Sequence, residues 1–293
     1  MSSFDLHQLL LADRVRLRAV RDAFRKTVRP GAVIVDLGSG TGILGYLALR
    51  AGAGRVYAIE RHPIVKLARS LAAENGFQDR VTFVKGDSRR VTLPERADLV
   101  ISDLVGPFGV DPEMAESIVD ARRFLKKGGR FVPERSELWM APVSAPALHR
   151  RHVLPGKGCG IRLDAVHAIA ANRMGVFRGA PRGLAAPLRR CFVFDFARDA
   201  ERFPRRAAAR VRVKGGLLHG LAVVVKVRLF PGVAMDSRYG CHWQPMFLPV
   251  RRPIATRAGE RVPVELTLHD LSNIEWRVGD QRQSTLLERA AYE

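Results

Sequence analysis

The sequence contains a glycine-rich turn that can bring the backbone close to a ligand. The apolar segment 33–37 is followed by Gly38, Gly40 and Thr41, and a helical pattern begins at Ile43. Glycines at such a turn let the chain bend sharply and approach a ligand with no Cβ in the way. A dinucleotide-binding turn has glycine or alanine at the sixth position counted from its first glycine, where this chain has Ile43. The spacing therefore disfavours a nicotinamide dinucleotide as the ligand.

Carboxylates stand at the ends of the three apolar segments nearest to this turn. Asp36 lies near the end of the first segment, Glu60 closes the second, and Gly86 and Asp87 follow the third. Asp36 suits a ligand with a cationic head, because it would repel a pyrophosphate. Glu60, about 20 residues after the turn, can accept hydrogen bonds from both hydroxyl groups of a ribose. Asp87 can accept one from an adenine amino group, so together they predict a site for a nucleoside-type ligand.

The elements that must position these residues alternate between apolar runs and helical patterns. Apolar runs that predict buried parallel strands occupy 33–37, 55–59, 81–84, 99–101 and 130–132. Helical intervals between apolar residues predict helices over 4–27, 43–51 and 64–71. Ligands gather at the carboxyl ends of such strands, so the carboxylates are expected to meet at that edge. Each of them alone also fits a tight loop, an exposed strand end or a helix N-cap.

The pattern changes after Pro133. Apolar residues alternate with period two over 221–229 and 262–268, between turns rich in glycine and proline, which predicts antiparallel strands. We therefore expect an α/β, Rossmann-like domain with an N-terminal helical segment over residues 1–132. An antiparallel β-barrel-like domain is expected over residues 133–293.

The composition narrows the class of protein. Of 293 residues, 47% are hydrophobic, which is enough for a substantial core. No run approaches the about 18 apolar residues of a membrane helix, and no secretory signal pattern opens the sequence, so a cytoplasmic location is expected. Cys159, Cys191 and Cys241 are far apart and lack C-x-x-C spacing, so we expect reduced thiols and no metal site.

A formal net charge of +20 would attract polyanions. Only eight of the 49 basic residues are lysines, however, and the arginines are spread from Arg14 to Arg289 without forming one run. The sequence shows neither a basic patch nor a known nucleic-acid-binding motif. Contact with nucleic acid therefore stays open but is not favoured.

The glycine-rich turn and the segments around it resemble the signature of protein arginine methyltransferases. The resemblance covers residues 36–44, 51–53 and 56–60, and it continues through Leu93-Pro94-Glu95, 124–129, Pro133 and Cys241-His242-Trp243. Phe4, His7, Asp13 and Arg16 have the spacing that the family uses in its N-terminal helix. The resemblance implies that S-adenosylmethionine is the methyl donor, that Arg16 holds its carboxylate, and that His242 approaches Asp13. We place His7, Arg61, Ser88 and Ser102 with the donor-binding residues as well.

The sequence departs from the family in the loop that carries two glutamates for gripping a guanidinium. Asp103 stands in place of the first glutamate. Pro112 falls where the second would be, between Asp111 and Glu113. Arg89 occupies the position of the family's adenine-binding acid, which leaves that role to Asp87.

These departures leave several functions open. Methyl transfer is an in-line displacement, and a guanidinium is a poor nucleophile unless carboxylates orient it and localise its charge. Asp103 could do so with Glu113 or Asp111 if the loop register shifts by one residue. We expect N-methylation of arginine or a related nitrogen in a protein or peptide. The alternatives are methylation of a small molecule or RNA, and a donor-binding scaffold without activity. By the same resemblance, a segment at about 150–175 is expected to act as an arm in a homodimer.

Overall fold

The computed structural model of the chain describes residues 3–110, 112–153, 157–158, 160–198, 205–270 and 273–289. The chain divides into two compact units. The first unit comprises 1–136, 194–201 and 226–236, and the second comprises 137–193, 202–225 and 237–293. The expected functional division after residue 132 stays a prediction. It lies four residues before the first boundary between the units, at 136/137.

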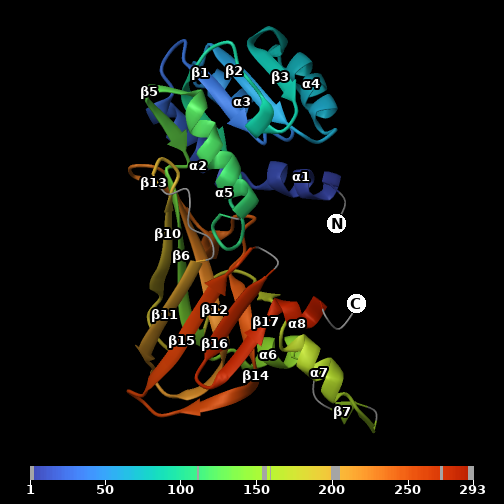
Figure 1. Ribbon diagram of the computed structural model, residues 1–293, viewed down its shortest axis with the longest axis vertical. Helices are drawn as coiled ribbons and strands as arrows, with labels where there is room; N and C mark the ends of the chain where they lie inside the picture. Colours follow the sequence, from blue (N-terminus) through green and yellow to red (C-terminus); the bar gives the residue numbers. More distant parts are fainter. Residues whose placement is uncertain are drawn as a thin grey trace. The chain divides into compact units, whose positions relative to one another are not determined.

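The first unit is built on a five-stranded sheet with the order β3-β2-β1-β4-β5 (Figure 1). Its strands are β1 Val33–Leu37, β2 Arg55–Glu60, β3 Val81–Lys85, β4 Ala97–Ser102 and β5 Leu125–Val132. Neighbouring strands are parallel throughout. All five residues of β1 are buried, as expected for a central strand covered on both faces. The Rossmann-like α/β fold is thereby confirmed.

Helices precede, connect and follow these strands. They are α1 Ser3–Ala12, α2 Arg14–Thr27, α3 Ile43–Arg50, α4 Val65–Glu74 and α5 Pro112–Asp120, with 3₁₀ turns η1 Gln78–Arg80, η2 Ser88–Arg90 and η3 Ala121–Phe124. The expected helical segment 4–27 is two helices, because Asp13 interrupts it and its side chain accepts the N–H of Arg16 at 2.8 Å. That bond is the usual N-cap interaction, which ends one helix and begins another.

Antiparallel strands follow, as the period-two pattern predicts. One sheet has the order β10-β6-β12-β14-β9, with β13 paired to β12, and a second has the order β11-β15-β16-β17. The strands are β6 Arg135–Val143, β9 Gly175–Val176, β10 Arg189–Asp195, β11 Arg205–Arg212, β12 Gly216–Phe230, β13 Val233–Asp236, β14 Met246–Thr256, β15 Arg261–Leu268, β16 Ile274–Val278 and β17 Gln281–Ser284. The remaining elements are α6 Pro146–His152, the β7 Lys157–Gly158 and β8 Ile161–Arg162 pair, α7 Asp164–Ala170, η4 Ser237–Tyr239 and α8 Thr285–Arg289. The antiparallel class is confirmed, whereas closure into a barrel stays a prediction.

The strand order determines where a ligand site can form. It reverses between β1 and β4, and open α/β sheets bind ligands at the carboxyl ends of strands beside such a reversal. Over the part of the chain that the structure describes, no helix combines the length and apolar character of a membrane span.

Candidate active site

A cavity of about 510 Å³ lies at the carboxyl ends of the parallel strands. This volume is within the range of sites for small molecules and cofactors, roughly 300–1,000 Å³. The residues that line the cavity come from α1, from the turns after β1 to β4 and from α5: Leu6, His7, Leu10, Leu37, Gly38, Ile59, Glu60, Arg61, His62, Gly86, Asp87, Ser88, Asp103, Leu104, Met114 and Ser117. Sequence reasoning had not identified the apolar members from α1 and α5, because their pattern is that of any helix packed on a core.

The glycine-rich turn fits closely beneath α1. Gly38 and Gly40 have φ angles of 66° and 54°, in the region that only glycine adopts easily. A Cβ on Gly40 would come within 2.9 Å of Cε1 of His7. The turn therefore needs glycine at residue 40 both for its backbone conformation and for the approach of the histidine.

Glu60 joins the turns after β1 and β2. The residue is 6% exposed, its Oε2 accepts the N–H of Gly40 at 2.9 Å, and its Oε1 accepts the N–H of His62 at 2.7 Å. These bonds fix the orientation of the carboxylate in the cavity wall. Each carboxylate oxygen can accept a second hydrogen bond, so Glu60 can still receive two ligand hydroxyl groups.

Asp36 lies behind the turn and does not belong to the cavity lining. The residue is 1% exposed, and its Oδ2 accepts the N–H of Gly45 in α3 at 3.0 Å. Burial raises the pKa of Asp36 to about 7, and the charges of Asp103 and Glu60 add to the shift. The carboxylate thereby fastens α3 to β1, and the expected contact with a cationic ligand head stays a prediction.

Arg16 and Asp103 form a buried ion pair. Nη1 of Arg16 donates to Oδ2 of Asp103 at 2.5 Å, and Nη2 donates to the carbonyl oxygen of Leu10 at 2.7 Å. Arg16 is 1% exposed and the Asp103 side chain is 19% exposed. Nε of Arg16 is buried without a hydrogen-bond partner among the described residues. The arginine therefore orients Asp103 at the cavity wall, and its Nε makes neither of these bonds.

Sequence reasoning missed this pair, although it singled out both residues. They lie 87 positions apart, and no local signal connects a helical arginine with the end of a strand.

Arg89 holds Asp87 from one side. Its Nε and Nη2 donate to the two carboxylate oxygens of Asp87, at 3.1 Å and 2.8 Å, and its Nη1 donates to Glu116 of α5 at 2.9 Å. The Arg89 guanidinium lowers the pKa of Asp87 to about 2. Asp87 lines the cavity as an ionised carboxylate, so the expected contact with an adenine amino group stays a prediction.

The remaining expected donor-binding residues divide into two groups. Gly86, Ser88 and Arg61 line the cavity. Thr41 and Ser102 are buried outside its lining. The Ser102 hydroxyl donates to the carbonyl oxygen of Leu37 and accepts the N–H of Leu104, both at 3.1 Å, and so holds the ends of β1 and β4 together.

The expected second acid beside Asp103, either Asp111 or Glu113, stays a prediction. Asp111 lies outside the described residues, and Glu113 is described only as the second residue of α5. The ring of His242 packs against Trp243 with a centroid distance of 4.5 Å, and its approach to Asp13 stays a prediction. Within the described ranges, no cluster of three or more His, Cys, Asp or Glu side chains could hold a metal ion.

Comparisons with known proteins agree with this architecture. A family model described as a methyltransferase domain matches residues 29–149. A probable protein arginine N-methyltransferase 6 of Arabidopsis thaliana is 36% identical over 144 residues, which cover 48% of this chain and 33% of that protein. Protein arginine N-methyltransferase PRMT10 of Oryza sativa subsp. japonica is 37% identical over 145 residues, 48% of this chain and 38% of that protein. The matched region thus spans between a third and two fifths of the length of these curated relatives.

Solved structures resemble the chain over nearly its whole length. The Trypanosoma brucei PRMT1 enzyme–prozyme heterotetrameric complex with AdoHcy gives a TM-score of 0.84 at 22% identity, covering 95% of this chain and 96% of that one. Arabidopsis thaliana protein arginine methyltransferase 10 gives a TM-score of 0.79 at 18% identity, covering 95% and 97%. At these identities the structures establish the likeness in fold. Residues 29–149 of the chain therefore match a methyltransferase domain, and the whole chain has the fold of solved protein arginine methyltransferases.

Proposed function

We propose that this chain transfers a methyl group from S-adenosylmethionine to a guanidinium nitrogen of arginine in a protein or peptide. The observation that carries the proposal is the Arg16–Asp103 ion pair, which places an oriented carboxylate in the wall of the cavity that Glu60 and the glycine turn form. The sequence relatives are named arginine N-methyltransferases, and one structural relative was solved with AdoHcy.

The residues around the cavity fit the methyl donor. Glu60 has acceptor capacity for a ribose, and Gly38 of the turn lines the cavity without a side chain of its own. Arg16 is 1% exposed and does not line the cavity, so the predicted contact of its Nε with the donor's carboxylate rests on the resemblance to the family. When bound, the donor supplies an electrophilic methyl carbon.

Asp103 acts on the acceptor in this proposal. Arg16 fixes its carboxylate by a charge-assisted hydrogen bond of 2.5 Å, so the second oxygen is held in a defined direction. A guanidinium that hydrogen-bonds to this carboxylate has its positive charge drawn away from the attacking nitrogen. The nitrogen loses a proton as it gains the methyl group, and an ionised carboxylate in contact with it can accept that proton.

A second candidate is a subunit that binds the donor without transferring the methyl group. Pro112 stands where the family has its second glutamate, which weakens the guanidinium grip. One structural relative is named as a complex of an enzyme with a prozyme, so the fold occurs in an assembly of that kind. We also propose that the acceptor is a protein or peptide and that the chain forms a homodimer through residues 150–175. We propose a cytoplasmic location as well.

The experiment combines calorimetric titration of S-adenosylmethionine with mass spectrometry of arginine-containing peptides incubated with labelled donor. Donor binding together with methylated arginine supports the enzyme. Donor binding without label in peptides, small molecules or RNA supports the non-catalytic subunit. Absence of donor binding contradicts both candidates. The test variant is Asp103→Asn, which is expected to lose methyl transfer while it still binds the donor. Equal losses of methyl transfer and of donor binding would contradict the role given to Asp103.

A further inference from the structure

The first unit carries a second recess at the opposite end of its parallel sheet. The recess has a volume of about 290 Å³ and lies at the amino ends of β1 and β4, whereas the candidate active site lies at their carboxyl ends. Its wall consists of the end of α2, the loop to β1, the first part of β5 and one side chain of β12: Lys26, Thr27, Val28, Arg29, Ala32, Ile34, Asp98, Leu99, Lys126, Lys127, Gly128, Gly129, Arg130 and Phe230. Because the two sites use different residues, a ligand in one can be tested separately from a ligand in the other.

A bulge in β5 brings several basic residues to the recess. Ala97 of β4 pairs with Leu125, but Leu99 pairs with Arg130, so the register shifts and residues 126–129 loop out of the ladder. Gly128, with φ of 80°, makes the turn possible. A bulge of this kind redirects side chains at the edge of a sheet. Lys126, Lys127 and Arg130 therefore reach the recess from one strand.

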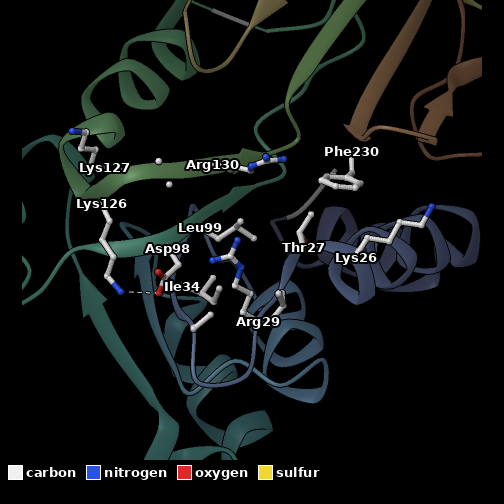
Figure 2. Close-up of a pocket in the computed structure, with 14 residues that line it drawn as sticks. Lys26, Thr27, Arg29, Ile34, Asp98, Leu99, Lys126, Lys127, Arg130 and Phe230 are labelled. Carbon is white, nitrogen blue, oxygen red and sulfur yellow. Dashed lines mark hydrogen bonds and ion pairs between the residues drawn. The ribbon is translucent and has the colours of Figure 1, made fainter.

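Figure 2 shows how the charged side chains are arranged. Arg29 lies within the recess, Arg130 points toward Phe230, and Lys126 points toward Asp98. Lys26 and Lys127 extend from opposite sides.

A second cavity lies along α2. This neighbouring cavity of about 550 Å³ shares Lys26 and is lined by α2 and the turn at the start of β13: Val15, Arg18, Ala19, Asp22, Arg25, Lys26, Gly232, Val233 and Ala234. We call the two cavities together the basic groove.

The basic groove has an excess of positive charge. Seven basic side chains line it and only two acidic ones, Asp22 and Asp98. Asp98 already accepts from Nζ of Lys126 at 2.8 Å and from the N–H of Val33 at 2.9 Å, and Asp22 lies 3.4 Å from Arg25. Among the described residues, no acidic side chain lies within ion-pair distance of Arg18, Lys26, Arg29 or Lys127. These four exposed cations are available to an anionic ligand.

An aromatic ring lies beside the cations. The guanidinium carbon of Arg130 is 5.8 Å from the centroid of the half-buried Phe230 ring. Grooves that bind single-stranded nucleic acid combine cations for the phosphates with an aromatic face on which an unpaired base can stack. An acidic peptide would use the cations but gain nothing specific from the ring.

We propose that the basic groove binds single-stranded nucleic acid through its phosphodiester backbone, with one base stacked at Phe230. The groove presents cations and one ring, and recognition is therefore independent of base sequence. Its cations come from positions 18 to 130, so they form no single basic run in the sequence.

The test is fluorescence anisotropy with labelled 12-nucleotide poly-U RNA, poly-T DNA of the same length and a 12-residue polyglutamate peptide, at 50 to 200 mM salt. Arg29→Gln combined with Lys127→Gln removes two phosphate contacts. Each contact contributes about 0.7 to the slope of log affinity against log salt, so the slope falls by about 1.4 and affinity at 0.1 M salt falls about 25-fold. Phe230→Leu is expected to weaken binding by about fivefold or more with the slope unchanged.

The matched control is Lys66→Gln combined with Arg251→Gln, two exposed residues outside the groove. It removes the same charge and is expected to change affinity less than about twofold. Circular dichroism checks that each variant is folded. Equal weakening by the control pair would show general attraction to a basic protein and overturn the proposal. Polyglutamate could instead bind more tightly than either oligonucleotide and lose that binding in the Arg29→Gln, Lys127→Gln variant. That result would overturn the proposal and assign the groove to an acidic protein. RNA and DNA bound with similar affinity support the proposal, because the phosphate backbone is common to both.

Discussion

Replacing Asp103 by asparagine should destabilise the protein strongly, because it leaves the buried charge of Arg16 without its ion-pair partner. Arg16 is 1% exposed and bonds to Asp103 at 2.5 Å. Removing one partner of a buried ion pair costs about 3 kcal/mol or more. At roughly 2–4 °C per kcal/mol, the melting temperature should fall by roughly 6–12 °C. Thermal and urea unfolding followed by circular dichroism measure both quantities.

Glu265→Gln is the matched control for this change. The Glu265 side chain is 17% exposed and that of Asp103 is 19% exposed, so the two carboxylates are equally accessible. The partner of Glu265, Arg206, is 65% exposed, with Nε 2.9 Å from Oε1. Exposed pairs of this kind contribute about 0–1 kcal/mol, and the control should therefore lower stability little. The difference between the two losses of stability therefore measures the effect of burying the arginine.

A double-mutant cycle with Arg16→Met completes the test. The bond from Arg16 to the Leu10 carbonyl is lost in both Arg16→Met and the double variant, so it cancels. If the ion pair is the source of the destabilisation, the double variant should lose about 2 kcal/mol less than the sum of the single variants. Additive losses, or a cost for Asp103→Asn no larger than for Glu265→Gln, would refute the reasoning.

Three further predictions concern ligand binding and pH. Glu60→Gln should raise the dissociation constant of S-adenosylmethionine about tenfold or more, because hydrogen bonds to a charged acceptor contribute about 1.5–3 kcal/mol, and an unchanged calorimetric constant would contradict the cavity assignment. Asp36 binds a proton more tightly in the folded than in the unfolded state, with a pKa of about 7 instead of 3.8, so its burial lowers stability as the pH rises between these values. Asp36→Asn should remove this loss, roughly 4 kcal/mol by pH 8 at about 1.4 kcal/mol per pKa unit, and parallel pH profiles of unfolding for variant and wild type would count against it. Burial lowers the pKa of His149 and His219 from 6.5, so stability should fall as the pH drops below that value, and His219→Leu should reduce the fall in melting temperature between pH 7.5 and 5.5.

The sequence predicted the parallel-sheet unit because its signals are local. The observed strands β1 to β4 lie within two residues of the expected runs, and β5 extends five residues further toward the amino end. The break at Asp13 was not expected, since a continuous apolar spacing hides an N-cap. The period-two pattern identified β12, although residues 218–225 are buried on both faces.

The sequence by itself determined the positions of Glu60 and the glycine turn, because a strand, a tight turn and a helix fix those residues within one short stretch of chain. Only the tertiary structure decided what each carboxylate does. Asp36 is withdrawn behind the turn to hold Gly45, and Asp103 is brought to an arginine 87 positions away. The basic groove likewise exists only in three dimensions, where the end of α2, the bulge in β5 and Phe230 meet. The physical reason is that hydrogen bonds and ion pairs depend on distances of about 3 Å in space, and these are set by packing between elements whose separation along the chain carries no such information.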